Sequence, residues 1–236
     1  MAAAIIGKKL GMTRVFDDDG AAIPVTVIEA APNVITAIRR SERDGYDALQ
    51  LAGVPTSERK LTKGELGHLK KANAGAMRTI AEFRDLELSP AGAAKGGEGG
   101  DEASEEAEGA EQTEAAEGSR KVGETVTVAD FTPGEAIKVS AVSIGKGFQG
   151  TIRRHNFSRG PVSHGSHNVR APGSAGASAD PARIFPGQAM PGRMGARRVT
   201  QRGATIVEVD ADRNLLLVKG SVPGAKNATV EVRSVG

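Results

Sequence analysis

The sequence contains no cysteine and no tryptophan, and aromatic residues make up only 3% of it. Without cysteine the chain has no disulfide, no thiolate to offer a metal and no cysteine nucleophile, which suits a reducing compartment. The scarcity of aromatics limits the core, although 39% of the 236 residues are apolar and can build one. We therefore expect a modest globular core with no redox chemistry on the chain.

Long apolar runs are also lacking. No stretch of 18 apolar residues is present, so the sequence predicts no membrane-spanning helix. Met1 is followed by the short run AAAII, which is too short for the apolar part of a secretory signal. We expect a cytoplasmic protein that has no membrane partner.

Acidic residues are almost absent from residues 143–204. This stretch holds one of them, Asp180, against ten lysines and arginines, and it also holds eleven glycines and five prolines. A segment that buries so little apolar surface cannot offset the entropy lost when it becomes ordered, so something outside the chain has to order it. The excess of positive charge indicates a polyanion.

Basic residues are absent from residues 96–119, which carry nine acidic ones. The net charge of +2 therefore hides two segments of opposite sign. Large apolar residues are missing as well, so we predict a disordered acidic loop over residues 91–120. It is either a spacer that leaves the fold at a surface hairpin or a shield that competes with the polyanion for the basic stretch.

The rest of the chain is mainly β. Short segments with alternating β-branched residues are separated by turn residues, at a spacing that favours a small barrel over a parallel sheet. One short helix is predicted near residues 62–74, where Leu66 and Leu69 lie three apart. The predicted strands cover residues 2–7, 12–16, 23–30, 34–40, 46–52, 79–88, 123–131, 136–144 and 228–235, with two more joined around residues 210–214.

Strands on both sides of the basic stretch make it an excursion from one barrel. Residues 1–90, 121–142 and 205–236 are assigned to that barrel, and residues 143–204 to a basic extension whose two ends lie close together. Half of the extension running out and half returning reaches at most about 100 Å when fully extended. It is therefore long enough to enter a large particle.

One motif suggests nucleotide chemistry. Residues 145–150 (GKGFQG) match the glycine string of dinucleotide-binding sites and follow a predicted strand. The following segment, TIRRHNFSRGP, lacks the apolar helix of such sites, and no acidic residue occurs before Asp180. A dinucleotide-binding enzyme remains the alternative from a different functional class.

Metal and hydrolase chemistry are disfavoured in the same stretch. His155, His164 and His167 have no cysteine and almost no carboxylate around them, so a zinc ion would add positive charge to an existing excess. A serine hydrolase would need an acid to orient its base, and Asp180 has no nucleophile-elbow sequence around it.

The composition of the stretch suits RNA. Arginines can bind phosphates with two parallel hydrogen bonds, and glycines let backbone N–H groups approach phosphate closely. Phe148, Phe157, His155 and His164 can stack on unpaired bases. A solvated basic loop without a partner would invite proteolysis and nonspecific binding.

At these residues the sequence resembles a known family, the bacterial form of large ribosomal subunit protein three. The resemblance covers nearly the whole chain except about residues 90–121. The matching strings are IIGKKLGMTRVF, IPVTVIEA, GYDALQLA, GHLKKA, GKGFQGTIRRHNFSRGPVSHGS, PARIFPGQAMPGRMGARRVT and NLLLVKGSVPG.

The resemblance implies a six-stranded barrel of the kind found in translation factors, with an extension that penetrates the large-subunit rRNA toward the peptidyl-transferase region. It implies a structural, early-binding partner of 23S rRNA and of neighbouring ribosomal proteins, with no catalytic residue, cofactor or small-molecule substrate. Residues 146–170 would form the deeper limb, with its tip at residues 156–167, and residues 183–202 the returning limb. An RNA chaperone acting outside the ribosome remains a third hypothesis. The candidate rRNA-binding residues are Lys8, Lys9, Lys146, Gly147, Phe148, Gln149, Arg153, Arg154, His155, Asn156, Phe157, Arg159, His164, His167, Arg170, Arg183, Arg193, Arg197, Arg198 and Arg202.

Three features depart from the family pattern. The acidic loop is not part of that pattern, so the resemblance gives it no role. Gly160 and Pro161 occupy the region where some bacterial members carry a methylated glutamine, so we do not predict that modification. Pro186 and Gln188 stand where many relatives are more basic, which weakens phosphate neutralisation on the returning limb.

Overall fold

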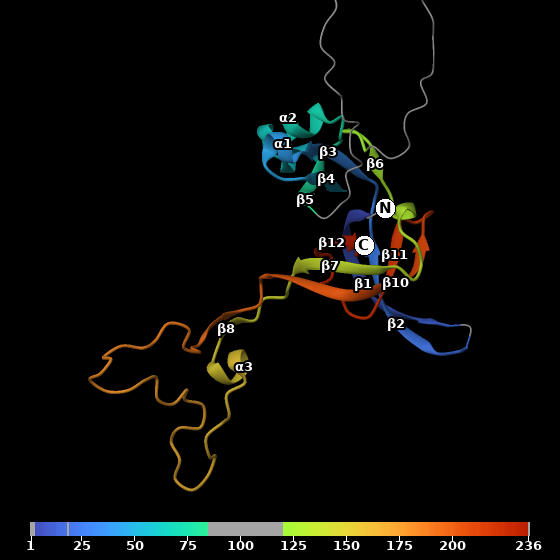
Figure 1. Cartoon of the computed structure of the whole chain (residues 1–236). Coiled ribbons are helices and arrows are strands. Elements are labelled where there is room, and N and C mark those ends of the chain that lie inside the picture. The colour runs from blue at the N-terminus through green and yellow to red at the C-terminus, as the bar shows by residue number, and fades with distance from the viewer. Residues whose placement is uncertain (1–2, 18, 85–119, 236) are drawn as a thin grey trace, which may run out of the picture.

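The computed structural model describes residues 3–17, 19–84 and 120–235. Its elements are labelled in Figure 1. Of the acidic loop predicted at residues 91–120, only Arg120 lies within the described residues. No helix in the described part of the chain is long and apolar enough to cross a membrane.

Six antiparallel strands form a closed barrel, which confirms the barrel and the mainly β fold predicted from the sequence. Closure pairs every strand on both sides and so removes exposed sheet edges. Large apolar side chains such as Ile5, Val139, Ile206 and Leu216 fill its centre and are fully buried. The strands follow one another around the barrel in the order β1 (Ala4–Phe16), β12 (Thr229–Ser234), β7 (Ala136–Val142), β10 (Arg198–Asp210), β11 (Leu215–Lys219) and β2 (Ala22–Glu29).

A second sheet of four strands lies beside the barrel (Figure 1). Its strands are ordered β5 (Met77–Phe83), β4 (Ala48–Pro55), β3 (Asn33–Arg39) and β6 (Thr125–Val126). These segments were predicted to belong to the barrel, but they pair with one another around a core of their own that includes Ile35, Leu51 and Phe83. The alternation of apolar residues is the same in both sheets and does not reveal which strands pair.

Short helices accompany the second sheet: α1 (Ser41–Asp44), the 3₁₀ turn η1 (Glu58–Lys60) and α2 (Lys63–Lys71). Helix α2 confirms the predicted helix near residues 62–74. It begins with a capping box, in which the Thr62 hydroxyl accepts from the Glu65 N–H and the Glu65 carboxylate accepts from the Thr62 N–H. Leu69 is buried against the second sheet, so this one side chain anchors a helix that is otherwise polar.

Strand β1 serves both cores. Ile5 points into the barrel, whereas Ile6 packs in the core of the second sheet. The Asn33 side-chain N–H₂ donates to the Ile6 carbonyl oxygen at 3.2 Å, and a Cβ on Gly53 would overlap the Asn33 side chain. Successive residues of a strand point to opposite faces, so burial of both faces explains the unbroken apolar run AAII at residues 3–6.

The prediction of a strand at residues 123–131 is wrong for most of that range. Only β6 is a strand there, and the 3₁₀ turn η2 (Val128–Asp130) follows it. Val126 packs in the core of the second sheet and Val128 in the barrel core. The segment crosses from one core to the other, which a straight strand along a single sheet does not do.

Two strand boundaries also differ from those predicted. The segments expected at residues 2–7 and 12–16 form the single strand β1, whose pairing with β2 is irregular between Lys9 and Gly11. Strand β10 begins at Arg198, so residues 198–204 belong to the barrel and not to the extension. The first half of β10 is polar and exposed, and its pairing shifts near Gly203 at a φ of +72°, which hides its strand character in the sequence.

Candidate nucleic-acid interface

The basic extension leaves the barrel at the end of β7 and returns at the start of β10 (Figure 1). Its base is a narrow neck in which β8 (Gly147–Gln149) pairs antiparallel with β9 (Gly192–Met194). Hydrogen bonds continue between the limbs below this pair, from Ser143 N–H to Arg197 O at 2.9 Å and from Lys146 N–H to Met194 O at 2.9 Å. The neck is therefore an ordered two-stranded ribbon.

Gly195 lies where the two limbs are closest. Its φ is +72°, in the region that only glycine adopts easily, and a Cβ there would overlap the Ile144 carbonyl oxygen. The Ala196 N–H next to it donates to the Ser143 carbonyl oxygen at 3.2 Å. A side chain at position 195 would push the limbs apart.

A five-residue helix, α3 (Thr151–His155), follows the outgoing strand of the neck. Arg154 Nη1 donates to the Met190 carbonyl oxygen at 2.6 Å, and the His155 Nε2 lies 3.0 Å from the same oxygen. The Arg154 guanidinium also occupies the space that a Cβ on Gly192 would need. These two predicted RNA-binding residues therefore link the outgoing limb to the returning one.

Beyond α3 the chain forms two irregular loops, one after the other, drawn in gold and orange in Figure 1. Asn156 ends the helix in the left-handed region, at a φ of +60°. The first loop is closed where the Gly160 N–H donates to the Val169 carbonyl oxygen at 3.1 Å, and it exposes His164 and His167. The single tip expected at residues 156–167 is thus only one of two loops.

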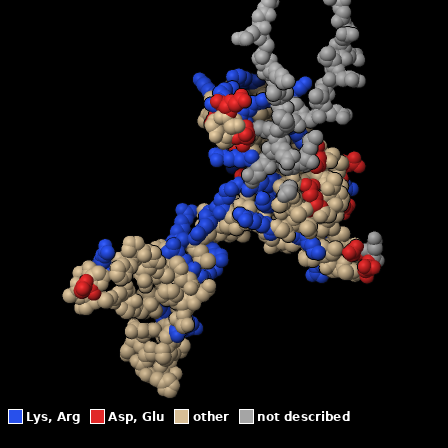
Figure 2. Space-filling model, viewed as in Figure 1, with Lys and Arg blue, Asp and Glu red and all other residues tan. Residues whose placement is uncertain are grey.

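Lysines and arginines gather on the neck and the adjoining face of the barrel (Figure 2). Of the ten cations of the sequence stretch, Arg198 forms an ion pair with Glu231 and Arg154 is turned inward. The other eight are exposed, and none has a carboxylate partner within the described ranges. They are Lys146, Arg153, Arg159, Arg170, Arg183, Arg193, Arg197 and Arg202.

Lys9, predicted to contact RNA from the barrel, is engaged within the protein. Its Nζ donates to the carbonyl oxygens of Val222 and Gly224 at 2.7 and 3.2 Å. A Cβ on Gly224 would lie 3.2 Å from the Val142 carbonyl oxygen, so this loop abuts the end of β7 where the extension starts. Lys9 therefore holds the loop that packs against the base of the extension.

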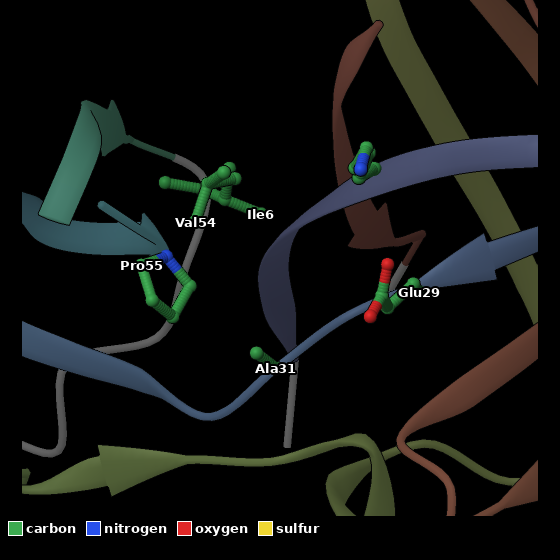
Figure 3. A pocket seen from close by; sticks show the side chains of 6 residues that line it. Ile6, Glu29, Ala31, Val54 and Pro55 are labelled. Carbon is green, nitrogen blue, oxygen red and sulfur yellow. The ribbon is translucent and has the colours of Figure 1, made fainter. Parts of the chain in front are cut away.

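Lys8 lies elsewhere, at a cleft of about 290 Å³ between the barrel and the second sheet. Figure 3 shows Val54 and Pro55 of β4 on one side of this cleft and Glu29 of β2 on the other. Lys8 pairs with Glu29 in the β1–β2 ladder and is half-buried. The structure does not bring Lys8 together with the cations of the extension.

Aromatic side chains are available on the extension. Phe148 in β8 is 75% exposed, and Phe157 lies 6.2 Å from the His155 ring. Phe185 was not among the predicted RNA-binding residues; it is 61% exposed, with the Arg183 guanidinium 5.7 Å from its ring centre. The arginine two residues before this phenylalanine was the signal that could have found it.

The two remaining candidates, Gly147 and Gln149, shape the neck. Gly147 has a φ of +69°, and the Gln149 side-chain N–H₂ donates to the Lys146 carbonyl oxygen. Arg153 Nη1 in turn donates to Gln149 Oε1 at 3.4 Å. Both bonds lie within the outgoing limb and do not reach the returning one.

The glycine string at residues 145–150 is not placed as in a dinucleotide site. Such a site needs a parallel β–α–β unit with the string before a packed helix. Here residues 147–149 form a short strand, the helix after it has five residues, and every strand pair among the described residues is antiparallel. The arrangement offers charge and exposed rings for a polyanion, and no phosphate-binding helix.

Comparisons with known proteins agree with this geometry. The family model for ribosomal protein L3 matches residues 107–214. Large ribosomal subunit protein uL3 of Acaryochloris marina is 42% identical over 233 residues, which are 99% of this chain and 96% of the relative. The uL3 of Synechococcus sp. (strain JA-3-3Ab) is 43% identical over 232 residues, 98% of this chain and 95% of the relative. The uL3c of Cyanophora paradoxa is 42% identical over 235 residues, 100% of this chain and 99% of the relative. The chain therefore belongs to the ribosomal protein L3 family.

Proposed function

We propose that the protein is a structural constituent of the large ribosomal subunit and binds 23S rRNA directly through its extension. It binds early in assembly, beside neighbouring ribosomal proteins of the cytoplasmic ribosome, and has no catalytic role. The relatives named above are large-subunit proteins and are matched along nearly their whole length. The proposal rests above all on eight exposed cations, seven on the extension and Arg202 in β10, that have no carboxylate partner among the described residues.

Charge neutralisation is the first part of the mechanism. Exposed arginines without a carboxylate partner can bind phosphate with two parallel hydrogen bonds, and each phosphate that they neutralise releases counterions. Asp180 is the single acidic residue between positions 143 and 204, so repulsion of RNA is weak there. The extension therefore favours a polyanion, above all at the neck, where the cations gather (Figure 2).

Stacking is the second part. Unpaired RNA bases pack on aromatic rings and on guanidinium planes, and this contact does not depend on base identity. Phe148 on the neck and Phe185 on the second loop are both largely exposed. Each can hold a base that its neighbouring cations bring near.

The ordered neck decides where the loops lie in the particle. Its backbone ladder and the bonds of Arg154 and His155 to Met190 fix the direction of the outgoing limb. The loops themselves bury little apolar surface, and we expect rRNA to order them. By the family resemblance, the first loop with His164 and His167 lies nearest the peptidyl-transferase region.

Sedimentation of a cell lysate tests the proposal against an RNA chaperone outside the ribosome. The tagged full chain should travel with large subunits and stay with them through a moderate salt wash. A variant in which the seven exposed cations outside β10 are replaced by glutamine leaves the barrel strands unchanged; it is the control and should be depleted from that fraction. Recovery of the unmodified chain only at the top of the gradient would contradict the proposal and favour the chaperone.

A further inference from the structure

A shallow groove lies at the base of the extension, where the two limbs leave β7 and β10. We call it the neck groove; its volume is about 250 Å³. This is below the roughly 300–1,000 Å³ of pockets for drug-sized ligands, so the groove suits one small ring system. Its lining includes Ile144, Lys146, Met194, Gly195, Arg197 and Val199.

The groove is formed before anything binds. Its walls are held by the bonds from Ser143 N–H to Arg197 O and from Lys146 N–H to Met194 O, both 2.9 Å. Gly195 has no side chain to fill the space, and its backbone approaches Ile144 closely. A ligand therefore loses little affinity to ordering of the protein.

Apolar side chains are left exposed in this rigid groove. Ile144 is 61% exposed and Val199 is 39% exposed, although both lie next to fully ordered backbone. Exposed apolar surface of this kind is stabilised when a flat apolar partner covers it. The groove needs an occupant with an apolar face.

The charges at the groove identify the occupant. Lys146 and Arg197 are exposed and have no carboxylate partner in the described part of the chain. An apolar protein side chain would cover the groove but leave two cations partly desolvated and unpaired, which is costly. A nucleotide supplies both parts, a flat base and an anionic phosphate.

We propose that the neck groove holds a single unpaired RNA nucleotide. The base packs on Ile144 and Val199, and the adjoining phosphate is bound by Lys146 and Arg197. This site deepens the proposed function, on which it rests, because it assigns one nucleotide to a defined groove in which an apolar contact and a phosphate contact occur together. It places the first RNA contact at the barrel end of the extension, before the loops begin.

Equilibrium binding of the full chain to large-subunit rRNA at several salt concentrations tests this site. Ile144→Ser should weaken binding about fivefold, because the base loses apolar surface to pack on, and leave the salt slope unchanged. Lys146→Gln should lower the steepness of the slope by about 0.7, the value for one phosphate on a single strand. Ile184→Ser is the matched control, because Ile184 is 50% exposed on the extension but does not line the groove.

The outcomes separate this inference from the proposed function. If the unmodified chain binds with a steep salt slope and Ile144→Ser binds equally well, the groove site is wrong and the proposed function stands. If the unmodified chain does not bind at all, the proposed function itself fails. Photocrosslinking from a benzoylphenylalanine at position 199 in assembled subunits should label RNA, and a crosslink only to protein would overturn the nucleotide as occupant.

Discussion

Arg153 and Arg154 are neighbours in α3, yet their side chains have different tasks. Arg153 is exposed and bonded only to Gln149 on its own limb, at 3.4 Å. Arg154 reaches across the neck to the Met190 carbonyl oxygen at 2.6 Å. The first is free to bind phosphate, whereas the second positions the limb that carries it.

Glutamine variants of the two arginines should therefore behave differently. Arg153→Gln should reduce the salt slope of rRNA binding by about 0.7 and leave amide exchange in the neck unchanged. Arg154→Gln should leave the slope nearly unchanged and speed amide hydrogen exchange in β8 and β9, because it removes a bond between the limbs. Equal slope changes in the two variants would contradict these roles.

Two glycines with the same φ of +72° offer a second comparison at this scale. A Cβ on Gly195 would overlap the Ile144 carbonyl oxygen, whereas a Cβ on Gly203 would meet nothing within 4 Å. Alanine at either position should destabilise the folded protein by about 1–2 kcal/mol, because its Cβ is unfavourable in the left-handed region. Gly195→Ala must in addition separate the limbs.

We expect Gly195→Ala to abolish the protection of the Ala196 amide against hydrogen exchange, since that N–H donates to Ser143. Gly203→Ala should retain this protection. Exchange measured by NMR on both variants decides the matter. A neck that stays protected in Gly195→Ala would show that the close approach of the limbs is not essential.

The residue-level roles that the sequence could not predict all depend on distant partners. Lys9, Arg154 and Arg198 carry charges like those of the other candidates. In the structure Lys9 donates to the carbonyl oxygens of Val222 and Gly224, and Arg154 donates to that of Met190. Arg198 forms an ion pair with Glu231. None of these contacts is local in sequence, so composition identified the basic surface but could not separate free cations from those that brace it.

At the scale of elements, helix α2 is the one whose start the sequence signals most directly. Thr62 and Glu65 have the spacing of a capping box and form both of its hydrogen bonds. The backbone N–H of Thr62, and then its hydroxyl, donate to the Glu65 carboxylate and lower its pKa below the usual range. The cap thus favours the ionised carboxylate.

Removal of this cap gives a prediction for the helix. Thr62→Ala should destabilise the second sheet and its helix by about 1 kcal/mol, and Thr62→Ser should retain most of that stability. NMR titration should show the pKa of Glu65 rising toward its ordinary value in the alanine variant only. An unchanged pKa in Thr62→Ala would contradict the role of the hydroxyl.

The same bond gives the helix a pH dependence of known sign. Because the pKa of Glu65 is lowered in the folded protein, its contribution is present above the ordinary carboxyl pKa and is lost as pH falls through the lowered value. The stability difference between the unmodified chain and Glu65→Gln should therefore shrink in acid. Thermal unfolding measured from neutral to acidic pH checks this trend.

Strand pairing shows how far the sequence predicts the elements. Most strands were located correctly, because their alternating apolar residues are a local signal. Their division between the barrel and the second sheet was not predicted. It is decided by side-chain packing such as that of Ile5 and Ile6 into different cores, and by the close approach of Gly53 to Asn33. These contacts join segments that lie far apart in the chain.

At the scale of the whole molecule, charge and apolar core are separated in space. The barrel and the second sheet bury most of the apolar side chains, whereas the free cations gather mainly on the neck and the adjoining face of the barrel (Figures 1 and 2). The sequence already showed this separation as a segment with one acid among ten bases. The ordered neck that directs the segment appeared only in the structure.

The salt dependence of rRNA binding by the full chain tests the central claim most directly. If the eight exposed cations all contact phosphate, the logarithm of the binding constant should fall with the logarithm of salt concentration with a slope of about −6. The variant in which the seven of these cations that lie outside β10 are replaced by glutamine should lose most of that slope while its barrel unfolds at an unchanged temperature. A slope near zero for the unmodified chain, or equal slopes for the two proteins, would contradict the account.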